Sequence, residues 1–271
     1  MRNPRGYVSL ILIILFLSLS CSTVPITGRK QFSILPSSVM LSMSLQQYDE
    51  FLKTNKISRN QEQTQMVKKV GKNIQGAVVK YFDERNMSYE LRDYEWEFNL
   101  VESQEVNAWA MPGGKVVVYE GILPIAKDEA GLAVVMGHEI AHAIAKHGNE
   151  RMSQGLVAQM GGMALSKALE EKPEKTNQLW MAAFGIGVQY GVILPFSRLQ
   201  ETEADHLGLI FMAMAGYDPN EAVEFWERMA QTKDGQVPPE FLSTHPSDET
   251  RIRKIKESIP KAKQYYNRSA K

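Results

Sequence analysis

The sequence predicts an α+β fold that is mainly helical and contains one small sheet. Apolar residues recur at intervals of three and four over much of the chain, as in residues 37–53, which is the spacing of amphipathic helices. Residues 94–101 instead alternate between polar and apolar side chains, which indicates a strand. Hydrophobic residues make up 44% of the chain, enough for the core of one large domain. The 31 basic and 31 acidic residues cancel, so neither a nucleic-acid partner nor a polybasic membrane patch is expected.

The N-terminus has the pattern of a secretory signal. Basic residues precede the apolar run 8–20, which is too short for a comfortable membrane span, so residues 1–20 are predicted to be a signal peptide. The run ends at Cys21, the only cysteine, which excludes an internal disulfide. Its position resembles the lipobox of bacterial lipoproteins, although Ser18 stands where a leucine is usual. The resemblance implies lipidation of Cys21; an ordinary cleaved signal or an N-terminal anchor is the alternative.

A lipidated cysteine would anchor the mature chain stably, because two or more acyl chains hold a protein on a membrane. Ser22 follows it, not an aspartate that would suggest inner-membrane retention. The resemblance therefore implies an outer-membrane lipoprotein of the bacterial cell envelope that faces the periplasm. Residues 21–36 are expected to be the lipidated cysteine and a polar tether, and residues 37–271 a single domain.

The first half of that domain is expected to be scaffold. Residues 37–53 predict a helix, and Asn60 with Gln63 three positions later is typical of a helix start. Strands follow at 94–101, 107–111 and 115–119, the last two joined by a Met-Pro-Gly-Gly turn.

The chemistry is expected at His138-Glu-Ile-Ala-His142, an H-E-x-x-H pattern inside an apolar, alanine-rich run. On a helix, His138 and His142 lie on one face, and two imidazoles at this spacing fit two corners of a tetrahedral zinc site. Glu139 can reach a water on the metal without being a ligand. The alternative, a buried helix with two hydrogen-bonded histidines, is costly because it buries polar groups without a use.

A catalytic zinc needs a third protein ligand and one open position. A third histidine would be needed at 148, which is a glycine, and His147 is one residue out of register and is expected on the surface. We expect Glu201 as the ligand and Asp205 as the carboxylate that accepts the free N–H of a ligand histidine. Glu203 is the rival, but it has no aspartate four residues later. An exposed charged helix face is the alternative for the whole cluster.

Two further regions leave alternatives open. Residues 155–194 are apolar and rich in glycine and methionine, and they predict a buried helical hairpin, a lid over the cleft, or a patch against membrane or partner. No stretch is expected to be apolar for long enough to span a membrane. His245, which precedes a proline, could stabilise an oxyanion, occupy the open zinc position at rest, or be a surface residue. Ser247 is expected to cap a last helix, and the tail from Lys261 to be frayed.

Three motifs, in this order, resemble one family: His138-Glu-Ile-Ala-His142, Ser197-Arg-x-x-Glu201-x-x-Ala-Asp205, and Ser243-Thr-His-Pro-Ser247 with Arg251. They look like the zinc metallopeptidases related to type-I CAAX prenyl proteases and bacterial heat-shock membrane proteases. The N-terminus looks like the periplasmic lipoprotein branch, which includes beta-barrel assembly-enhancing proteases.

The resemblance implies a zincin-type domain with a small edge-stranded sheet beside the active-site helix and one Zn²⁺ per chain. It gives Arg251 a place near Asp205 and His245 a place in the catalytic site. The edge strand of such peptidases pairs with an extended substrate, and the residues expected to do so are Asn107, Ala108, Trp109, Ala110 and Met111. An ordinary structural hairpin is the alternative.

The sequence thus predicts a zinc-dependent endopeptidase for protein quality control, acting on misfolded or unassembled envelope proteins. Its partners would be those substrates, the membrane through the lipid anchor, and the outer-membrane assembly machinery, with no nucleic acid. The second hypothesis is a chaperone or assembly factor for outer-membrane proteins in which proteolysis is secondary or repressed. A purely structural zinc site is disfavoured, because such sites are closed and seldom place a glutamate beside the ligands.

Overall fold

The computed structural model describes residues 21–232, 240–245 and 249–269, which fall into two compact units. The smaller unit joins the described residues up to Met40 with Lys146–Phe196. The larger unit joins Leu41–Ala145 with the described residues from Ser197 onward. The expected tether therefore belongs to the same unit as the segment that follows the H-E-x-x-H helix. The expected signal peptide, residues 1–20, lies outside the described residues.

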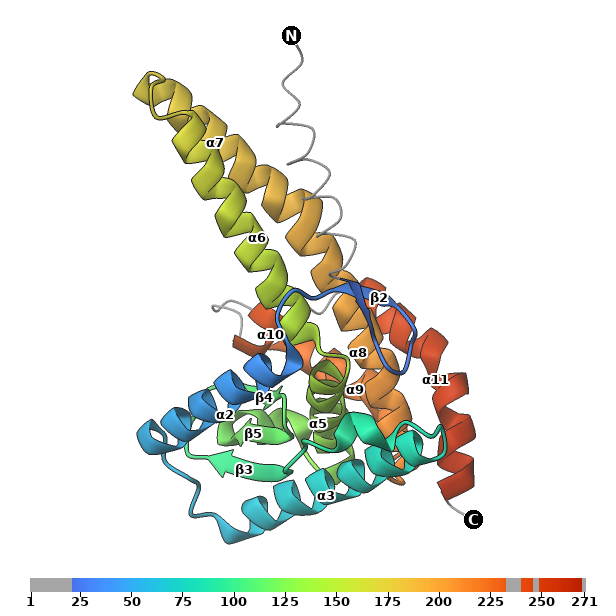
Figure 1. Ribbon diagram of the computed structural model, residues 1–271. Helices are drawn as coiled ribbons and strands as arrows, with labels where there is room; N and C mark the ends of the chain where they lie inside the picture. Colours follow the sequence, from blue (N-terminus) through green and yellow to red (C-terminus); the bar gives the residue numbers. More distant parts are fainter. Residues whose placement is uncertain (1–20, 233–239, 246–248, 270–271) are drawn as a thin grey trace. The chain divides into compact units, whose positions relative to one another are not determined.

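A three-stranded sheet lies between α2 (Ser37–Thr54) and α3 (Gln61–Asp83) in the larger unit (Figure 1). It contains β3 (Glu97–Val101), β4 (Ala108–Met111) and β5 (Lys115–Tyr119) in the order β3-β5-β4. The central strand β5 runs parallel to β3 and antiparallel to β4, and all of its residues are buried, as expected of a strand covered on both faces. The strand expected at an edge, β4, does lie at the edge of this sheet.

The turn between β4 and β5 depends on two glycines. Gly113 and Gly114 adopt φ angles of 89° and 85°, a region that side chains with a Cβ rarely enter. The predicted Met-Pro-Gly-Gly turn is therefore confirmed, and the two strands expected on either side of it form.

Helices cover both faces of the sheet. On one face lies α2 (Ser37–Thr54), whose Phe51 ring meets the Trp109 ring edge to face at a centroid distance of 4.9 Å. On the other face, Phe98 packs against Gly71 of α3 (Gln61–Asp83). The H-E-x-x-H helix is α5 (Glu129–Ile144), which packs against both α3 and the edge strand β4.

Side-chain caps fix where the two long helices begin. The Asn60 side chain accepts a hydrogen bond from the Gln63 amide at 3.1 Å, which confirms the predicted start of α3. Asp128 accepts from the first free amides of α5, those of Ala130 and Gly131, at 2.9 and 3.0 Å. Short helical turns complete this half of the unit: η1 (Ser88–Leu91), η2 (Glu120–Ile122) and α4 (Leu123–Ala126).

The C-terminal part of the larger unit is helical. Its elements are α8 (Leu194–Met214), which begins in the smaller unit, α9 (Glu221–Gln231), α10 (Glu240–Thr244) and α11 (Glu249–Ser269). The expectation of a frayed tail from Lys261 is wrong, because α11 continues beyond it to Ser269. Its last turns are held in place because Tyr265 lies against Tyr81 of α3, with ring centroids 6.2 Å apart. Ser247, the expected cap of this helix, lies outside the described residues.

Helices α5 and α8 cross with their backbones in contact at a pair of glycines. A Cβ placed on Gly208 would lie 2.9 Å from the carbonyl carbon of Gly137 and from the amide nitrogen of His138. A Cβ on Gly137 would lie 3.0 Å from the carbonyl oxygen of Gly208. Only residues without a side chain fit at this crossing, which lies directly beside the first histidine of the H-E-x-x-H motif.

In the smaller unit, two short antiparallel strands pack against a helix. The strands are β1 (Cys21–Thr23) and β2 (Lys30–Phe32), and the helix is α6 (His147–Ala168). Glu150 of α6 is fully buried and accepts hydrogen bonds from the Arg29 guanidinium at 2.8 and 3.0 Å and from the Phe32 amide at 3.3 Å. The residues expected to be an irregular tether therefore include two strands fastened to a helix.

Figure 1 shows α6 and α7 (Glu174–Val188) side by side as a hairpin, and α7 continues through the π-helical turn η3 (Gln189–Ile193) into α8. The buried hairpin considered for this region is wrong: between residues 155 and 193, all of which are described, Leu169 is the one buried side chain. The expectation that no stretch is long and apolar enough to cross a membrane is also wrong, because the continuous helix Glu174–Met214 meets that condition.

We predict that Gly208→Ala lowers the free energy of unfolding by about 1–3 kcal/mol, because the added methyl group must push two packed backbones apart. Gly76→Ala is the matched control. Gly76 is an exposed residue within α3 with no atom near its missing Cβ, so this change should be neutral or stabilise by about 0.4–1 kcal/mol. Urea denaturation of both variants measures the difference. Equal midpoints would show that the crossing has room for a side chain.

Candidate active site

Helix α5 presents three polar side chains that are all buried. His138, Glu139 and His142 have exposed fractions of 2, 4 and 4%. The two imidazoles lie one helical turn apart on the same face, and their Nε2 atoms are 3.0 Å from each other.

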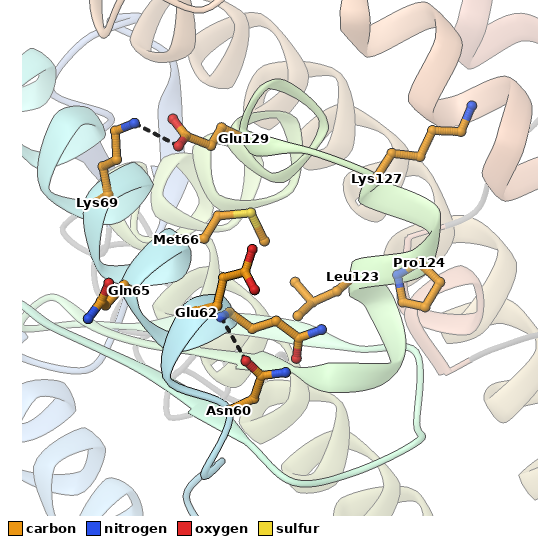
Figure 2. A pocket seen from close by; sticks show the side chains of 10 residues that line it. Asn60, Glu62, Gln65, Met66, Lys69, Leu123, Pro124, Lys127 and Glu129 are labelled. Atoms are coloured by element: carbon orange, nitrogen blue, oxygen red, sulfur yellow. Dashed lines mark hydrogen bonds and ion pairs between the residues drawn. The ribbon is translucent and has the colours of Figure 1, made fainter.

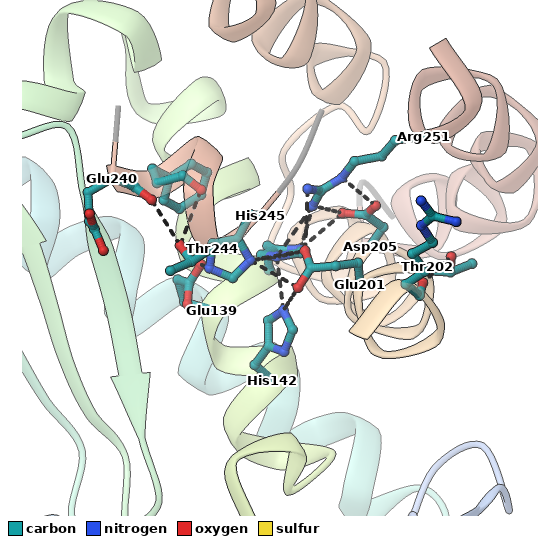
Figure 3. Close-up of polar contacts among 12 residues, drawn as sticks. Glu139, His142, Glu201, Thr202, Asp205, Glu240, Thr244, His245 and Arg251 are labelled. Atoms are coloured by element: carbon teal, nitrogen blue, oxygen red, sulfur yellow. Dashed lines mark hydrogen bonds and ion pairs between the residues drawn. The ribbon is translucent and has the colours of Figure 1, made fainter. Parts of the chain in front are cut away.

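Helix α8 brings a carboxylate to these two rings (Figure 3). The Glu201 carboxylate oxygens lie 3.3 Å from Nε2 of His138 and 3.2 Å from Nε2 of His142. Glu203, the rival on sequence grounds, is also buried but is not part of the group of donors that converge. The i, i+4 spacing places Asp205 on the same face of α8 as Glu201.

A third imidazole joins the group from a different element. His245 follows α10 directly and is 6% exposed, so it is not a surface residue. Its Nδ1 atom lies 3.1 Å from Nε2 of His138 and 3.0 and 3.1 Å from the two oxygens of Glu201. His138, His142, Glu201 and His245 therefore direct one donor atom each toward a common point.

The donor set fits a divalent metal ion. Neutral imidazole nitrogens and carboxylate oxygens are acceptors, so their convergence in a buried place is favourable only around a cation. Zinc bound to nitrogen at about 2.0–2.1 Å has tetrahedral ligand edges of about 3.3 Å. The distances between donor atoms in the cluster, 3.0–3.3 Å, are close to that edge. Three imidazoles with one carboxylate are typical zinc ligands.

Electrostatics in the cluster favour the same conclusion. Burial opposes the charged form of His138, but its hydrogen bonds to Asp205 and Glu201 outweigh this effect and raise the pKa of His138 to about 9. Burial also opposes the ionised Glu201, yet the positive charge of His142 and contacts with the other two imidazoles lower the pKa of Glu201. The site therefore holds a negative carboxylate together with a proton or a metal ion.

Behind the donors, a second layer of charges holds His138 in one orientation. Asp205 lies 2.9 Å from Nδ1 of His138, the ring nitrogen that faces away from the cluster. Arg251 of α11 donates to both oxygens of Asp205, at 2.9 and 2.8 Å, and its positive charge lowers the pKa of Asp205 despite burial. This carboxylate is therefore ionised, and it fixes the tautomer that leaves Nε2 of His138 free for a metal.

Glu139 stands beside the donors without being one of them. Its Oε1 atom is buried and makes no hydrogen bond among the described residues, although Nε2 of His245 lies 3.4 Å away. A buried carboxylate oxygen without a partner is costly, so it indicates a position where a water or a substrate group is bound.

The expected substrate strand lies next to these groups in the fold. Ala108 to Met111 form β4, which packs against α5 and has a neighbouring strand on one side only within the described part of the sheet. The carbonyl of Asn107 accepts from the Tyr119 amide at 3.1 Å, so the residue before β4 is also held against β5.

The sequence did not single out two aromatic residues of the site, Trp226 and Phe241. The Arg251 guanidinium stacks on Trp226 at 3.5 Å from the ring centroid, and the Phe241 ring lies 4.8 Å from that of His245. Trp226 shares the apolar face of α9 with ordinary core residues, so its spacing gave no sign of a role. His147 was expected on the surface, which is wrong, because it is fully buried at the start of α6.

A separate cavity of about 920 Å³ lies between the start of α3 and the α4–α5 junction (Figure 2). None of the converging donors lines it, and one side carries the ion pair between Lys69 and Glu129 at 2.7 Å. We assign the chemistry to the buried donor cluster and not to this cavity, because the cluster alone combines metal ligands with an unpaired carboxylate oxygen.

Comparison with known proteins identifies this arrangement. The profile of peptidase family M48 matches residues 69–259, which include all of the converging donors, Glu139, Asp205 and Arg251. The chain belongs to peptidase family M48. The mainly helical fold with a small sheet is accordingly the zincin-like metallopeptidase domain expected from the sequence.

Among family members, the mitochondrial metalloendopeptidase OMA1 of Schizosaccharomyces pombe is 40% identical over 174 residues, which are 64% of this chain and 49% of that protein. The human OMA1 metalloendopeptidase is 27% identical over 267 residues, 93% of this chain and 48% of that protein. The beta-barrel assembly-enhancing protease of Escherichia coli is 28% identical over 178 residues, 58% and 33% of the two chains. The chain thus spans about half the length, or less, of these relatives.

These relatives support the metallopeptidase assignment but not the expected location. A bacterial outer-membrane lipoprotein that faces the periplasm was expected from the N-terminus, and this expectation is contradicted, because OMA1 proteins from six organisms that match the chain are named as mitochondrial. The physical reason is that a short apolar run before one cysteine is a weak signal, whereas the similarity extends over the whole site. Cys21 begins β1, and its lipidation stays a prediction.

We predict that metal affinity at this M48 site rises with pH. His138 must lose the proton on Nε2 before it can bind a metal, and its raised pKa is about 9, so apparent affinity should increase about tenfold per pH unit between pH 7 and pH 9. In the metal-free protein, the stability of the fold changes with pH in the opposite direction. The raised pKa of His138 adds to the free energy of unfolding, fully below about pH 6.5, and this contribution is lost as pH rises through about 9. Chelator competition and thermal unfolding across this range measure the two trends.

The ligand assignment can be tested with two acids on α8. Glu201→Gln should weaken metal binding severely, because it removes the negative donor, whereas Glu203→Gln should bind metal as the parent protein does. Metal content after dialysis against a chelator measures both. Similar losses in the two variants would contradict the assignment.

Proposed function

We propose that the protein is a zinc-dependent endopeptidase that cleaves extended segments of misfolded or unassembled proteins. The observation that carries the proposal is the meeting of Glu201 with His138 and His142 beside the buried Oε1 atom of Glu139, which makes no hydrogen bond among the described residues. Ligands to a metal and a free general base in one buried place are the requirements for hydrolysing a peptide bond. Zinc is proposed as the ion because of its preference for such a nitrogen-rich set.

Each side chain has a definite part in this reaction. When bound, zinc would polarise a carbonyl group and lower the pKa of a water molecule toward ~7. Glu139 accepts the proton of the attacking water and then delivers it to the amine that leaves. Asp205, held by Arg251, keeps His138 in the tautomer with a free Nε2, so the geometry does not change between turnovers.

The proposed substrate class follows from the edge strand. A peptide that adds to β4 would be bound through its main chain, which does not require a particular side-chain sequence. Segments that have lost their folded structure are free to adopt this extended form, which supports a function in protein quality control. Asn107 and residues 108–111 are the proposed contacts, and Trp109 on this strand is partly exposed.

The names of the relatives support a mitochondrial setting for this activity and not a bacterial outer membrane. The chain is about half as long as these relatives or less, so their substrates and partners are not carried over to it. One observation supports the alternative of an assembly factor with repressed proteolysis: His245 lies where it could block the metal site.

His245 supplies a fourth donor at the place where a catalytic metal has its open position. We propose that this imidazole closes the site at rest and moves away when substrate binds. His245→Ala should then raise the rate of peptide cleavage, measured with a quenched fluorescent peptide and with metal content checked in parallel. A lower rate at unchanged metal content would instead assign His245 to stabilising the oxyanion.

The proposed role of Glu139 predicts that Glu139→Gln keeps metal and fold but lowers the cleavage of unfolded casein by roughly 10²–10⁴-fold, because the amide cannot accept a proton. Glu129→Gln, a change to an acid at the start of the same helix, is the matched control and should cleave at the parent rate. Undiminished cleavage by Glu139→Gln would refute the mechanism. If that inactive variant restored the growth of cells lacking the protein, binding and not hydrolysis would be the main function.

A further inference from the structure

The helical hairpin of residues 155–193 exposes an unusual amount of apolar surface. Side chains of both helices that would normally be buried are more than half exposed: Met160, Met163, Leu179, Trp180, Ile186 and Tyr190. No residue of α7 is buried. A pair of helices with so little buried surface gains little from the hydrophobic effect in water, so these residues are expected to be covered by another phase or molecule.

The exposed apolar residues are distributed around α7 and not along one face. Leu179, Trp180 and Met181 are consecutive, and consecutive residues on a helix point in directions about 100° apart. A protein partner or a second copy of the chain would cover one face and leave polar residues on the other. A helix that is apolar all round fits an environment that surrounds it, which is the hydrocarbon of a lipid bilayer.

The contact between α6 and α7 also has a feature that is typical of helices in lipid. Gly161 and Gly162 of α6 lie under the Phe184 ring, and a Cβ on Gly161 would be 3.0 Å from that ring. Small residues that allow close approach at a helix–helix contact are typical of helices packed in lipid, where no hydrophobic effect drives them together.

Length and charge fit a bilayer as well. The helix Glu174–Met214 contains a window of 18 residues with a mean hydropathy of 1.5, none of it buried. Eighteen residues of helix extend about 27 Å, close to the thickness of the hydrocarbon core. The charged residues of the hairpin collect at the turn between its helices, where they can remain in water, and their charges cancel: Lys167, Glu170, Glu171, Lys172, Glu174 and Lys175.

We propose that the hairpin of residues 155–193 embeds in a lipid bilayer and attaches the peptidase to it. This attachment is independent of lipidation at Cys21 and of the proposed catalytic mechanism. Because the charges of the turn cancel, the apolar side chains drive insertion, and anionic lipid is not required. The embedded helix continues without a break into α8, and Glu201 follows Ile193 by eight residues, so the membrane segment and a metal donor belong to one helix.

Trp180 gives a direct test in the full chain. The four tryptophans are at positions 96, 109, 180 and 226, so the apolar N-terminal residues 8–20 contribute none. The protein is mixed with phosphatidylcholine vesicles whose acyl chains carry bromine, a quencher confined to the hydrocarbon. We expect tryptophan emission to be quenched more in the parent protein than in Trp180→Phe, and acrylamide in the water to quench Trp180 less when vesicles are present. Equal quenching by brominated lipid in the two proteins would overturn the proposal.

A second pair of variants separates insertion from simple adsorption. The double change Leu179→Gln and Ile186→Gln alters exposed side chains, so the fold should persist, but it should abolish the quenching of Trp180 by brominated lipid. Val79→Gln, which removes an exposed apolar side chain of α3, is the matched control and should leave the quenching unchanged.

Salt and concentration distinguish the remaining explanations. Quenching by the neutral vesicles should be the same at 0.1 M and about 1 M salt, since screening affects only charge-driven binding. Sedimentation in buffer without lipid provides the last measurement. If Trp180 were already shielded from acrylamide there, in step with dimer formation, a second copy would cover the hairpin and the proposal would be overturned.

Discussion

The site depends on the contact between α5 and α8 at Gly137 and Gly208. Two helices normally lie 8–10 Å apart because side chains separate them, whereas here the backbones touch directly beside His138. This close crossing lets the short side chain of Asp205, one helical turn before Gly208, reach the far nitrogen of His138. Glu201, one turn earlier again, then meets the near nitrogen of the same ring. Metal binding therefore requires Gly137 and Gly208, although neither has a side chain that could bind the ion.

Charge balance is the second requirement, because nearly every polar group of the site is removed from water. Glu201 and Asp205 bring two negative charges, and Arg251 supplies one positive charge held between Asp205 and the Trp226 ring. A divalent metal ion more than offsets the one negative charge that remains. The same arrangement explains why His138 binds a proton so firmly in the absence of metal: a cation of some kind must occupy this place. A proton and a metal ion are therefore expected to compete for this place, so that metal affinity depends on pH.

Local patterns predicted much of this structure, and long-range contacts explain what they missed. The H-E-x-x-H spacing placed two imidazoles on one helix face, and the i, i+4 pair of acids distinguished Glu201 from Glu203, because both are consequences of helix geometry within a few residues. The positions of Trp226 and Phe241 depend on how four helices meet, which no local pattern contains. The sequence left the hairpin open between a buried pair of helices, a lid and a patch against membrane or partner, because an apolar helix has the same residue pattern whether protein or lipid surrounds it. The tail beyond Pro260 is helical because of its contact with Tyr81, almost two hundred residues earlier in sequence.

The contacts of Glu150 with Arg29 and Phe32 have a consequence for the stability of the smaller unit. Glu150 lies three residues after the start of α6 and has no exposed surface, and the Arg29 guanidinium and the Phe32 amide both donate hydrogen bonds to its carboxylate. Cleavage that removed the chain up to Phe32 would leave an isolated carboxylate in an apolar interior, a loss typically worth about 3–5 kcal/mol. The short strands β1 and β2 are therefore part of what keeps α6 folded, and not a passive connection ahead of it.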